Sequence, residues 1–181
     1  TLLWTPSYGN ALLAANWSPL THHGLVAAKG DGKRYWEDYF ATRYELNRDS
    51  GELTCTGRVE TVPLTYTRHY RFTDEEIIIT LTLRAEGDVT LAALHENLPF
   101  AGGALKSRGA ALSQTPGKIQ VSDKNGEGMA VTLDQPRTVK IQPNGLQRDG
   151  LQFARAEIEL PAVWKAGDSC TLTYRIAPVK K

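Results

Sequence analysis

The 181-residue sequence lacks the features that would direct it to nucleic acid or to a membrane. Its 21 basic and 20 acidic side chains give a formal net charge of +1, so there is no strong electrostatic attraction to a polyanion or to an anionic lipid surface. No apolar run approaches the roughly 20 residues that a membrane-spanning helix needs. We therefore expect neither nucleic acid nor a membrane as a partner.

The sequence signatures of cofactor and metal sites are also missing. There is no glycine-rich phosphate loop, no GxSxG elbow, no HExxH and no CxxC. The only cysteines, Cys55 and Cys170, share strand phase with apolar neighbours, which favours buried free thiols over the alternative of a disulfide. The run DKNGEG at 123–128 offers oxygen ligands for calcium, but it is typical of an ordinary β-turn. We expect no cofactor and no metal.

The sequence does contain a regular succession of short strands. Its clearest stretch has apolar residues at even positions of 64–72 and at odd positions of 77–83, with short polar turns at 73–75 and 86–88. A period of two places one row of side chains on a core and the other on the opposite face. We predict that 64–72, 77–83 and 89–96 form three consecutive strands of an antiparallel meander.

The remaining strands follow from the same pattern. The turn at 47–51 predicts a hairpin between 40–46 and 52–59. Residues 10–17 could form either a strand or a short helix, and Pro19 after them favours the strand. Further strands are predicted at 10–17, 23–28, 118–122, 129–133, 138–141, 151–160 (with a bulge between Phe153 and Ala154) and 170–176. About eleven to thirteen strands with little or no helix predict an all-β fold, an antiparallel β-sandwich.

The length and composition suit one domain over residues 1–181. With 41% hydrophobic residues, the chain can bury a core of its own. Its apolar start, Leu2-Leu3-Trp4, favours a domain excised from a longer protein.

The most unusual segment is 29–39, which crowds aromatic and charged side chains together. Sugars stack their C–H faces on aromatic rings while polar side chains bind the hydroxyls. The segment could therefore form a platform for a sugar, with Tyr35 as its exposed member. The alternative is that Trp36 and Tyr39 are core residues at the end of a sheet. The candidate ligand-binding residues are Arg34, Tyr35, Trp36, Glu37, Asp38 and Tyr39.

Four polar side chains form a second group of candidates. Arg68 and His69 lie in the first central strand, and His95 and Glu96 lie at the end of the third. A cluster of histidine, glutamate and arginine could act in acid–base chemistry. It could equally be a buried ion pair or a cross-strand surface pair.

The central stretch also resembles a known family pattern. Residues 68–72 (RHYRF), Asp74, 77–83 (IIITLTL) and 94–100 (LHENLPF) are similar to the β-sandwich domains of heparinase II/III-like polysaccharide lyases and, more broadly, to galactose-mutarotase-like super-sandwiches. The resemblance covers roughly residues 8–100 and implies an association with carbohydrate and an extracellular or periplasmic location. In those lyases the domain packs against a helical toroid that carries most catalytic residues. No toroid is present here, so no catalytic residue is carried over.

Three functions are compatible with these features. The leading hypothesis is a carbohydrate-associated domain, either glycan-binding or accessory to a polysaccharide-degrading enzyme, with carbohydrate and a flanking catalytic domain as partners. The first alternative is a protein-interaction or assembly module that uses the aromatic segment. The second is a mutarotase- or lyase-type enzyme that uses Arg68, His69, His95 or Glu96. For this chain alone we expect no catalysis.

Overall fold

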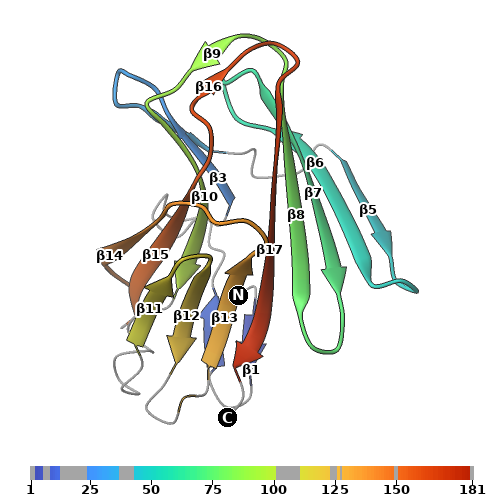
Figure 1. Ribbon diagram of the computed structural model, residues 1–181, viewed down its shortest axis with the longest axis vertical. Coiled ribbons are helices and arrows are strands. Elements are labelled where there is room, and N and C mark those ends of the chain that lie inside the picture. The colour runs from blue at the N-terminus through green and yellow to red at the C-terminus, as the bar shows by residue number, and fades with distance from the viewer. Residues whose placement is uncertain are drawn as a thin grey trace.

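The computed structural model of the chain describes residues 3–5, 9–12, 24–36, 43–100, 111–122, 126, 128–148 and 151–179. Two large antiparallel sheets face each other, and a small two-stranded sheet lies at one end of the molecule (Figure 1). The described residues hold no helix that is long and apolar enough to span a membrane. The predicted fold class, an all-β antiparallel β-sandwich, is confirmed.

The larger sheet has eight strands. Across the sheet they are β11 (Ala111–Thr115), β12 (Lys118–Ser122), β13 (Gly128–Leu133), β17 (Ser169–Val179), β8 (Ile77–Ala85), β7 (Leu64–Phe72), β6 (Glu52–Arg58) and β5 (Arg43–Asn47). The predicted hairpin is β5–β6. Its turn forms because Asn47 Oδ1 accepts hydrogen bonds from the backbone N–H groups of Asp49 and Ser50, and because Gly51 takes a positive φ of 66°.

The second sheet has seven strands and is centred on β10. Its main path is β1 (Leu3–Thr5), β2 (Gly9–Leu12), β10 (Ala93–Phe100), β15 (Leu151–Glu159) and β14 (Val139–Arg148), while β3 (Gly24–Ala28) pairs with β10 and β4 (Arg34–Trp36) pairs with β3. The two-stranded sheet consists of β9 (Val89–Thr90) and β16 (Val163–Trp164). Strand β10 therefore has neighbours on both sides, which places it in the interior of its sheet.

The predicted three-stranded meander is wrong in its third member. The chain leaves β8, forms the short β9 and crosses to the opposite sheet as β10, while the second neighbour of β8 is β17. The meander that does form is β5–β6–β7–β8. The alternation of apolar residues shows which side chains of a strand face the core. Because both sheets of a sandwich pack on the same core, the alternation does not show to which sheet the strand belongs.

The number and regularity of the strands also differ in detail from the prediction. The described residues form seventeen strands, four of which have only two or three residues and escape a pattern-based count. The bulge predicted between Phe153 and Ala154 lies in the facing strand instead, where the register shifts between Pro143 and Gln147. Pro143 pairs with Ala154, and proline has no backbone N–H to donate to the ladder.

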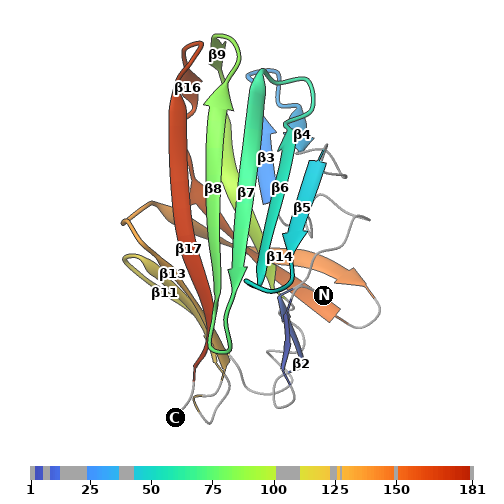
Figure 2. The same cartoon turned by 90° about the vertical axis from the view of Figure 1, so that its right-hand side faces the viewer.

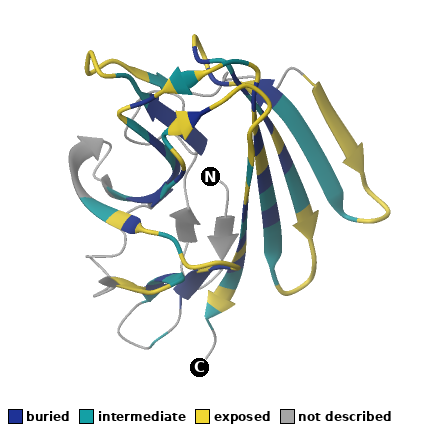
Figure 3. Cartoon of the chain, turned by 45° about the horizontal axis from the view of Figure 1, so that its top comes forward, coloured by how far each residue is buried: buried dark blue, intermediate teal, exposed yellow. Residues whose placement is uncertain are grey.

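The core fills the space between the two sheets. It is built from the inward rows that the alternation predicts, and Figure 3 shows buried and less buried residues alternating along the central strands, whereas β5 is exposed along its length. Its largest fully buried side chains are Tyr174, Leu25, Leu64, Ile79, Leu81, Leu83, Leu94, Leu98 and Ile119. No disulfide joins the half-buried Cys55 and Cys170, and Cys170 packs against the core.

Candidate functional site

The candidate site lies on the outer face of the seven-stranded sheet. On β10, Leu94 and Glu96 are buried in the core, whereas His95 between them lines a pocket on the opposite face. Adjacent residues of a strand point to opposite faces, so His95 and Glu96 cannot share one site. The register places His95 opposite Val26 of β3 and opposite Glu159 of β15.

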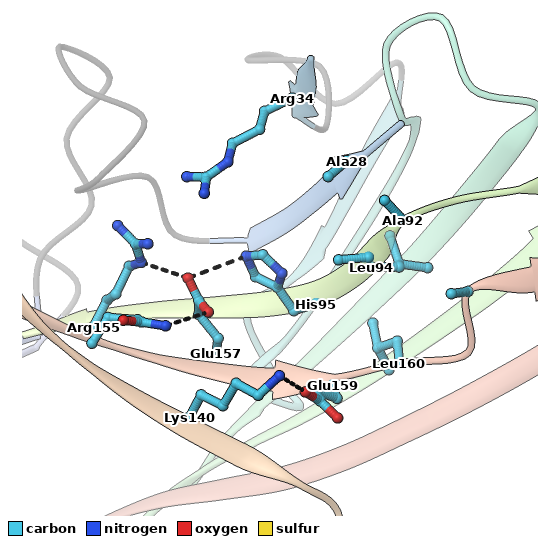
Figure 4. Close-up of a pocket in the computed structure, with 13 residues that line it drawn as sticks. Ala28, Arg34, Ala92, Leu94, His95, Lys140, Arg155, Glu157, Glu159 and Leu160 are labelled. Atoms are coloured by element: carbon cyan, nitrogen blue, oxygen red, sulfur yellow. Dashed lines mark hydrogen bonds and ion pairs between the residues drawn. The ribbon is translucent and has the colours of Figure 1, made fainter. Parts of the chain in front are cut away.

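The pocket has a volume of about 430 Å³ and is formed by side chains from β3, β4, β10, β14 and β15, together with residues that follow β15 (Figure 4). Part of its wall consists of the short side chains of Ala28, Ala92, Ala93 and Ala162, which leave the space open. The polar side chains that line it are Arg34, His95, Lys140, Gln142, Arg155, Glu157 and Glu159. Cations, carboxylates, an amide and an imidazole thus surround one cavity.

Glu157 is the centre of the polar contacts in the pocket. Its Oε1 accepts a hydrogen bond of 2.7 Å from Arg155 Nε and lies 3.7 Å from His95 Nε2 (Figure 4). Its Oε2 accepts a hydrogen bond of 3.3 Å from Gln142 Nε2. Beside this group, Lys140 forms an ion pair with Glu159. Glu157 therefore holds Arg155 and Gln142 by hydrogen bonds and lies next to His95.

The protonation states follow from burial and neighbouring charges. Burial lowers the pKa of His95, assisted by Arg155 and Arg34, and outweighs the opposing influence of Glu157. Burial tends to raise the pKa of Glu157, but the hydrogen bond from Arg155 and the charges around it bring that pKa below its ordinary value. At neutral pH the pocket therefore presents a neutral imidazole next to a carboxylate, so His95 can accept a proton or a hydrogen bond.

Replacing Glu157 with glutamine is expected to lower the pKa of His95 further, because Glu157 is the strongest influence that raises it. An NMR titration of the His95 ring protons measures this pKa. The matched control is Glu159→Gln, since Glu159 raises the His95 pKa less and should shift it less when neutralised. A rise in the His95 pKa in the Glu157 variant would contradict this electrostatic picture.

A second polar group is buried between the two sheets. Arg68 Nη2 of β7 donates to both carboxylate oxygens of Glu96 on β10, at 3.1 and 2.8 Å, and Tyr174 Oη of β17 donates to Glu96 Oε1 at 2.8 Å. The exposed fractions are 3% for Arg68 and 0% for both Glu96 and Tyr174. Burial and the adjacent Glu96 raise the pKa of Tyr174 well above its ordinary value, so the phenol stays protonated and remains a donor.

The Arg68–Glu96–Tyr174 group is shielded by close packing. The guanidinium carbon of Arg68 lies 5.4 Å from the centre of the Tyr66 ring, a cation–π distance. Gly57 of β6 makes room for this ring, because a Cβ there would lie 2.7 Å from Tyr66 Oη. This group is the buried ion pair that the sequence left open as an alternative to an acid–base cluster, and it is sealed from the pocket by β10 itself.

The predicted sugar platform is only partly described. Arg34 lines the pocket, whereas Tyr35 is half-buried, packs against the core and has Lys29 Nζ 4.7 Å from its ring centre. Trp36 is placed by its backbone, which pairs with Val26. Glu37, Asp38 and Tyr39 lie outside the described residues, as do Asp123, Asn125 and Glu127 of the weighed calcium turn. The sugar-binding role of the segment stays a prediction.

The second group of candidates is divided among three places. Arg68 and Glu96 are in the core, His95 is in the pocket, and His69 lies on the outer face of the eight-stranded sheet, 3.9 Å from Glu52. The four residues therefore do not converge on one site. Among the described residues, no group of three histidine, cysteine, aspartate or glutamate side chains is placed to hold a metal ion.

Sequence reasoning missed most residues of the pocket. Arg155, Glu157 and Glu159 alternate with Ala156 and Ile158, a pattern that indicates a strand with one charged face. The same holds for Lys140 and Gln142 beside Val139 and Ile141. The missing information was the pairing of β10 with β15, which brings His95 to residues about sixty positions away.

Comparisons with known proteins identify the fold. No protein-family model and no curated protein sequence matches this chain. The heparan sulfate lyase HepC from Pedobacter heparinus is similar over 98% of this chain and 28% of its own, with a TM-score of 0.61 and 12% identity. The 4-alpha-glucanotransferase from Thermococcus litoralis is similar over 91% of this chain and 28% of its own, with a TM-score of 0.60 and 14% identity.

A third similar structure has nearly the size of this chain. A candidate aldose 1-epimerase from Escherichia coli K12 is similar over 93% of this chain and 88% of its own, with a TM-score of 0.58 and 12% identity. At such identities the likeness concerns the fold. The chain is thus a β-sandwich like those of polysaccharide lyases and epimerase-like proteins, as the sequence resemblance implies, and it spans about 28% of the length of the heparan sulfate lyase.

Proposed function

We propose that this chain is a carbohydrate-binding β-sandwich domain that holds a sugar in the pocket around His95. The observation that carries the proposal is a cavity of about 430 Å³ whose lining combines donors, acceptors and short apolar side chains. A sugar needs both kinds of hydrogen-bond partner for its hydroxyls and an apolar surface for its C–H groups. Arg34 and Lys140 supply donors, Glu157 and Glu159 supply acceptors, and the alanines supply the apolar surface.

The fold comparisons support the same class of ligand and an accessory role. The similar structures bear the names of a heparan sulfate lyase, a glucanotransferase and a candidate sugar epimerase. Two of these proteins are much longer than the part that this chain matches. We therefore propose that the domain works beside a flanking catalytic domain and outside the cytoplasm, where polysaccharides are found.

One observation favours catalysis as a second candidate function. His95 is held neutral beside the Glu157 carboxylate, and a neutral imidazole in a cleft can accept a proton from a sugar. A mutarotase- or lyase-type reaction would use His95 as the base. Polarimetry on aldoses and the ultraviolet absorbance of unsaturated products test the two reactions, and both should disappear in His95→Ala.

The proposed pocket is tested by glycan binding. Affinity electrophoresis and calorimetry with neutral and acidic polysaccharides should show binding that weakens roughly tenfold to a hundredfold in Arg34→Gln, the range expected for losing a hydrogen bond from a charged group. The control is Arg48→Gln, which removes an exposed arginine in the β5–β6 turn that does not line the pocket, and this variant should bind normally. Absence of binding to any glycan by folded protein, or equal losses in both variants, would contradict the proposal.

The protein-interaction alternative has a different location. Tyr44 and Leu46 of the edge strand β5 are 73% and 57% exposed, and Phe72 of β7 is 44% exposed. These side chains, rather than Tyr35, are where an apolar protein contact would form. Light scattering over a range of concentrations tests self-association through them.

A further inference from the structure

The outer face of the eight-stranded sheet carries an ordered array of hydroxyl groups. The register aligns Thr56, Thr67, Thr82 and Thr171 in one row across β6, β7, β8 and β17. The next row is Thr54, His69, Thr80 and Thr173. Figure 2 looks onto this face, where β17, β8, β7, β6 and β5 lie side by side in front of the other sheet. Sheet hydrogen bonding holds the hydroxyls at fixed spacings.

Arginine side chains surround these rows. Five arginines and two glutamates of β5 to β8 and β17 point to the same face as the threonine rows. The whole chain, by contrast, is nearly neutral, with a net charge of +1. The outward arginines are Arg43, Arg58, Arg71, Arg84 and Arg175, and the glutamates are Glu45 and Glu52. Positive charge therefore predominates among the outward side chains of these five strands.

Three of these cations form no ion pair within the described part of the chain. Arg43 pairs with Glu45, and Arg175 contacts Glu76 and Asp134. Arg58, Arg71 and Arg84 are exposed and form no ion pair with any described residue. Arg58 and Arg84 occupy the row of Thr65, on the strands to either side of it. Two strand spacings put their backbones about 9–10 Å apart, which suits two neighbouring anionic groups of a polysaccharide.

We propose that this face binds an anionic polysaccharide, with Arg58 and Arg84 holding successive sulfate or carboxylate groups and the threonine rows binding hydroxyls. A guanidinium binds such anions with two parallel hydrogen bonds. The proposal rests on the proposed function for the class of partner, but the surface lies on the opposite side of the sandwich from the His95 pocket.

The composition of the face selects this partner over others. None of the outward residues of β5 to β8 and β17 is phenylalanine, tyrosine or tryptophan, which disfavours single-stranded nucleic acid, because its bases bind mainly by stacking on such rings. The same strands have few outward apolar side chains, Ile78 being the largest, so the face lacks the apolar centre of a protein interface. Charge complementarity and hydroxyl density favour an anionic polysaccharide.

The test is binding of the full chain to heparin, measured by calorimetry and by the salt concentration that elutes the protein from immobilised heparin. The double variant R58Q/R84Q should bind heparin roughly tenfold more weakly, in line with two exposed charge contacts. The matched control is R48Q, since Arg48 is an exposed arginine in the β5–β6 turn. Both proteins should keep the melting temperature of the parent.

Three outcomes would overturn the proposal. Equal heparin affinity in R58Q/R84Q and R48Q would show that these two arginines do not bind the polysaccharide. Loss of heparin binding in His95→Ala, with R58Q/R84Q unaffected, would place the ligand in the pocket and leave the proposed function standing. Retention of a DNA fragment as strong as that of heparin, lost in the same double variant, would assign the face to nucleic acid. Conversely, if R58Q/R84Q weakens heparin binding and pocket variants do not, the result would support the outer face and not the pocket as the heparin-binding site.

Discussion

Replacing Arg68 with methionine is expected to lower the free energy of unfolding by about 3–5 kcal/mol, because it leaves a buried charge without its partner. Glu96 is fully buried, and its carboxylate receives two hydrogen bonds from Arg68 and one from Tyr174. Methionine has a similar length and fills the space, so the loss reports the missing charge rather than a cavity. Urea denaturation followed by tryptophan fluorescence measures the change.

The triple variant Arg68→Met/Glu96→Leu/Tyr174→Phe is the control for this experiment, because Glu96→Leu also removes the acceptor of the buried Tyr174 hydroxyl. With both charges gone, an apolar pair of similar size should recover much of the lost stability, since such replacements are often neutral or stabilising. If the single variant loses less than about 1 kcal/mol, the range of an exposed pair, the two groups are not desolvated as the structure places them.

Replacing Leu81 with alanine is expected to lower the free energy of unfolding by about 2–5 kcal/mol, the range for deleting a buried leucine side chain. Leu81 is 0% exposed and lies in the middle of β8, with neighbours Arg68 on β7 and Leu172 on β17. The cavity would open beside the buried ion pair, where surrounding atoms have little freedom to collapse. The matched control is the adjacent Thr82→Ala, an exposed position that should change stability by less than about 0.5 kcal/mol. Similar losses in both variants would mean that β8 faces the core differently.

The sequence predicts the strands well and their partners poorly. The hairpin of β5 and β6 and the inward row of Ile79, Leu81 and Leu83 follow from alternation and turn chemistry, which are local properties. The crossing of the chain to β10 does not follow, because a row of apolar side chains is satisfied by either sheet. The same uncertainty made Arg68 and Glu96 a candidate pair without showing that β7 and β10 face each other across the core.

The pocket shows the same limit more strongly. The sequence alone grouped His95 and Glu96 as members of one candidate cluster, although adjacent strand residues point to opposite faces and this rule could have separated them. The rule could not supply Glu157 or Arg155, because these meet His95 only through the pairing of β10 with β15. Tyr35 was expected to be exposed, but it is half-buried for a related reason. Strand β4 pairs with β3, and in this arrangement Arg34 lines the pocket and Tyr35 packs against the core.

The order of strands in the eight-stranded sheet has a consequence for synthesis and folding. Thr80 of β8 and Thr173 of β17 are 93 positions apart, yet their hydroxyl oxygens lie 3.3 Å from each other. The meander β5–β8 can therefore form during synthesis, before β17 has been made. Until β17 pairs with β8, one edge of β8 has unpaired backbone groups. Such non-local pairing slows folding to the millisecond-to-second range, and a waiting edge can pair with another chain. Slower synthesis of the segment between β8 and β17 would lengthen the time for which this edge is exposed. The yield of soluble protein should then fall.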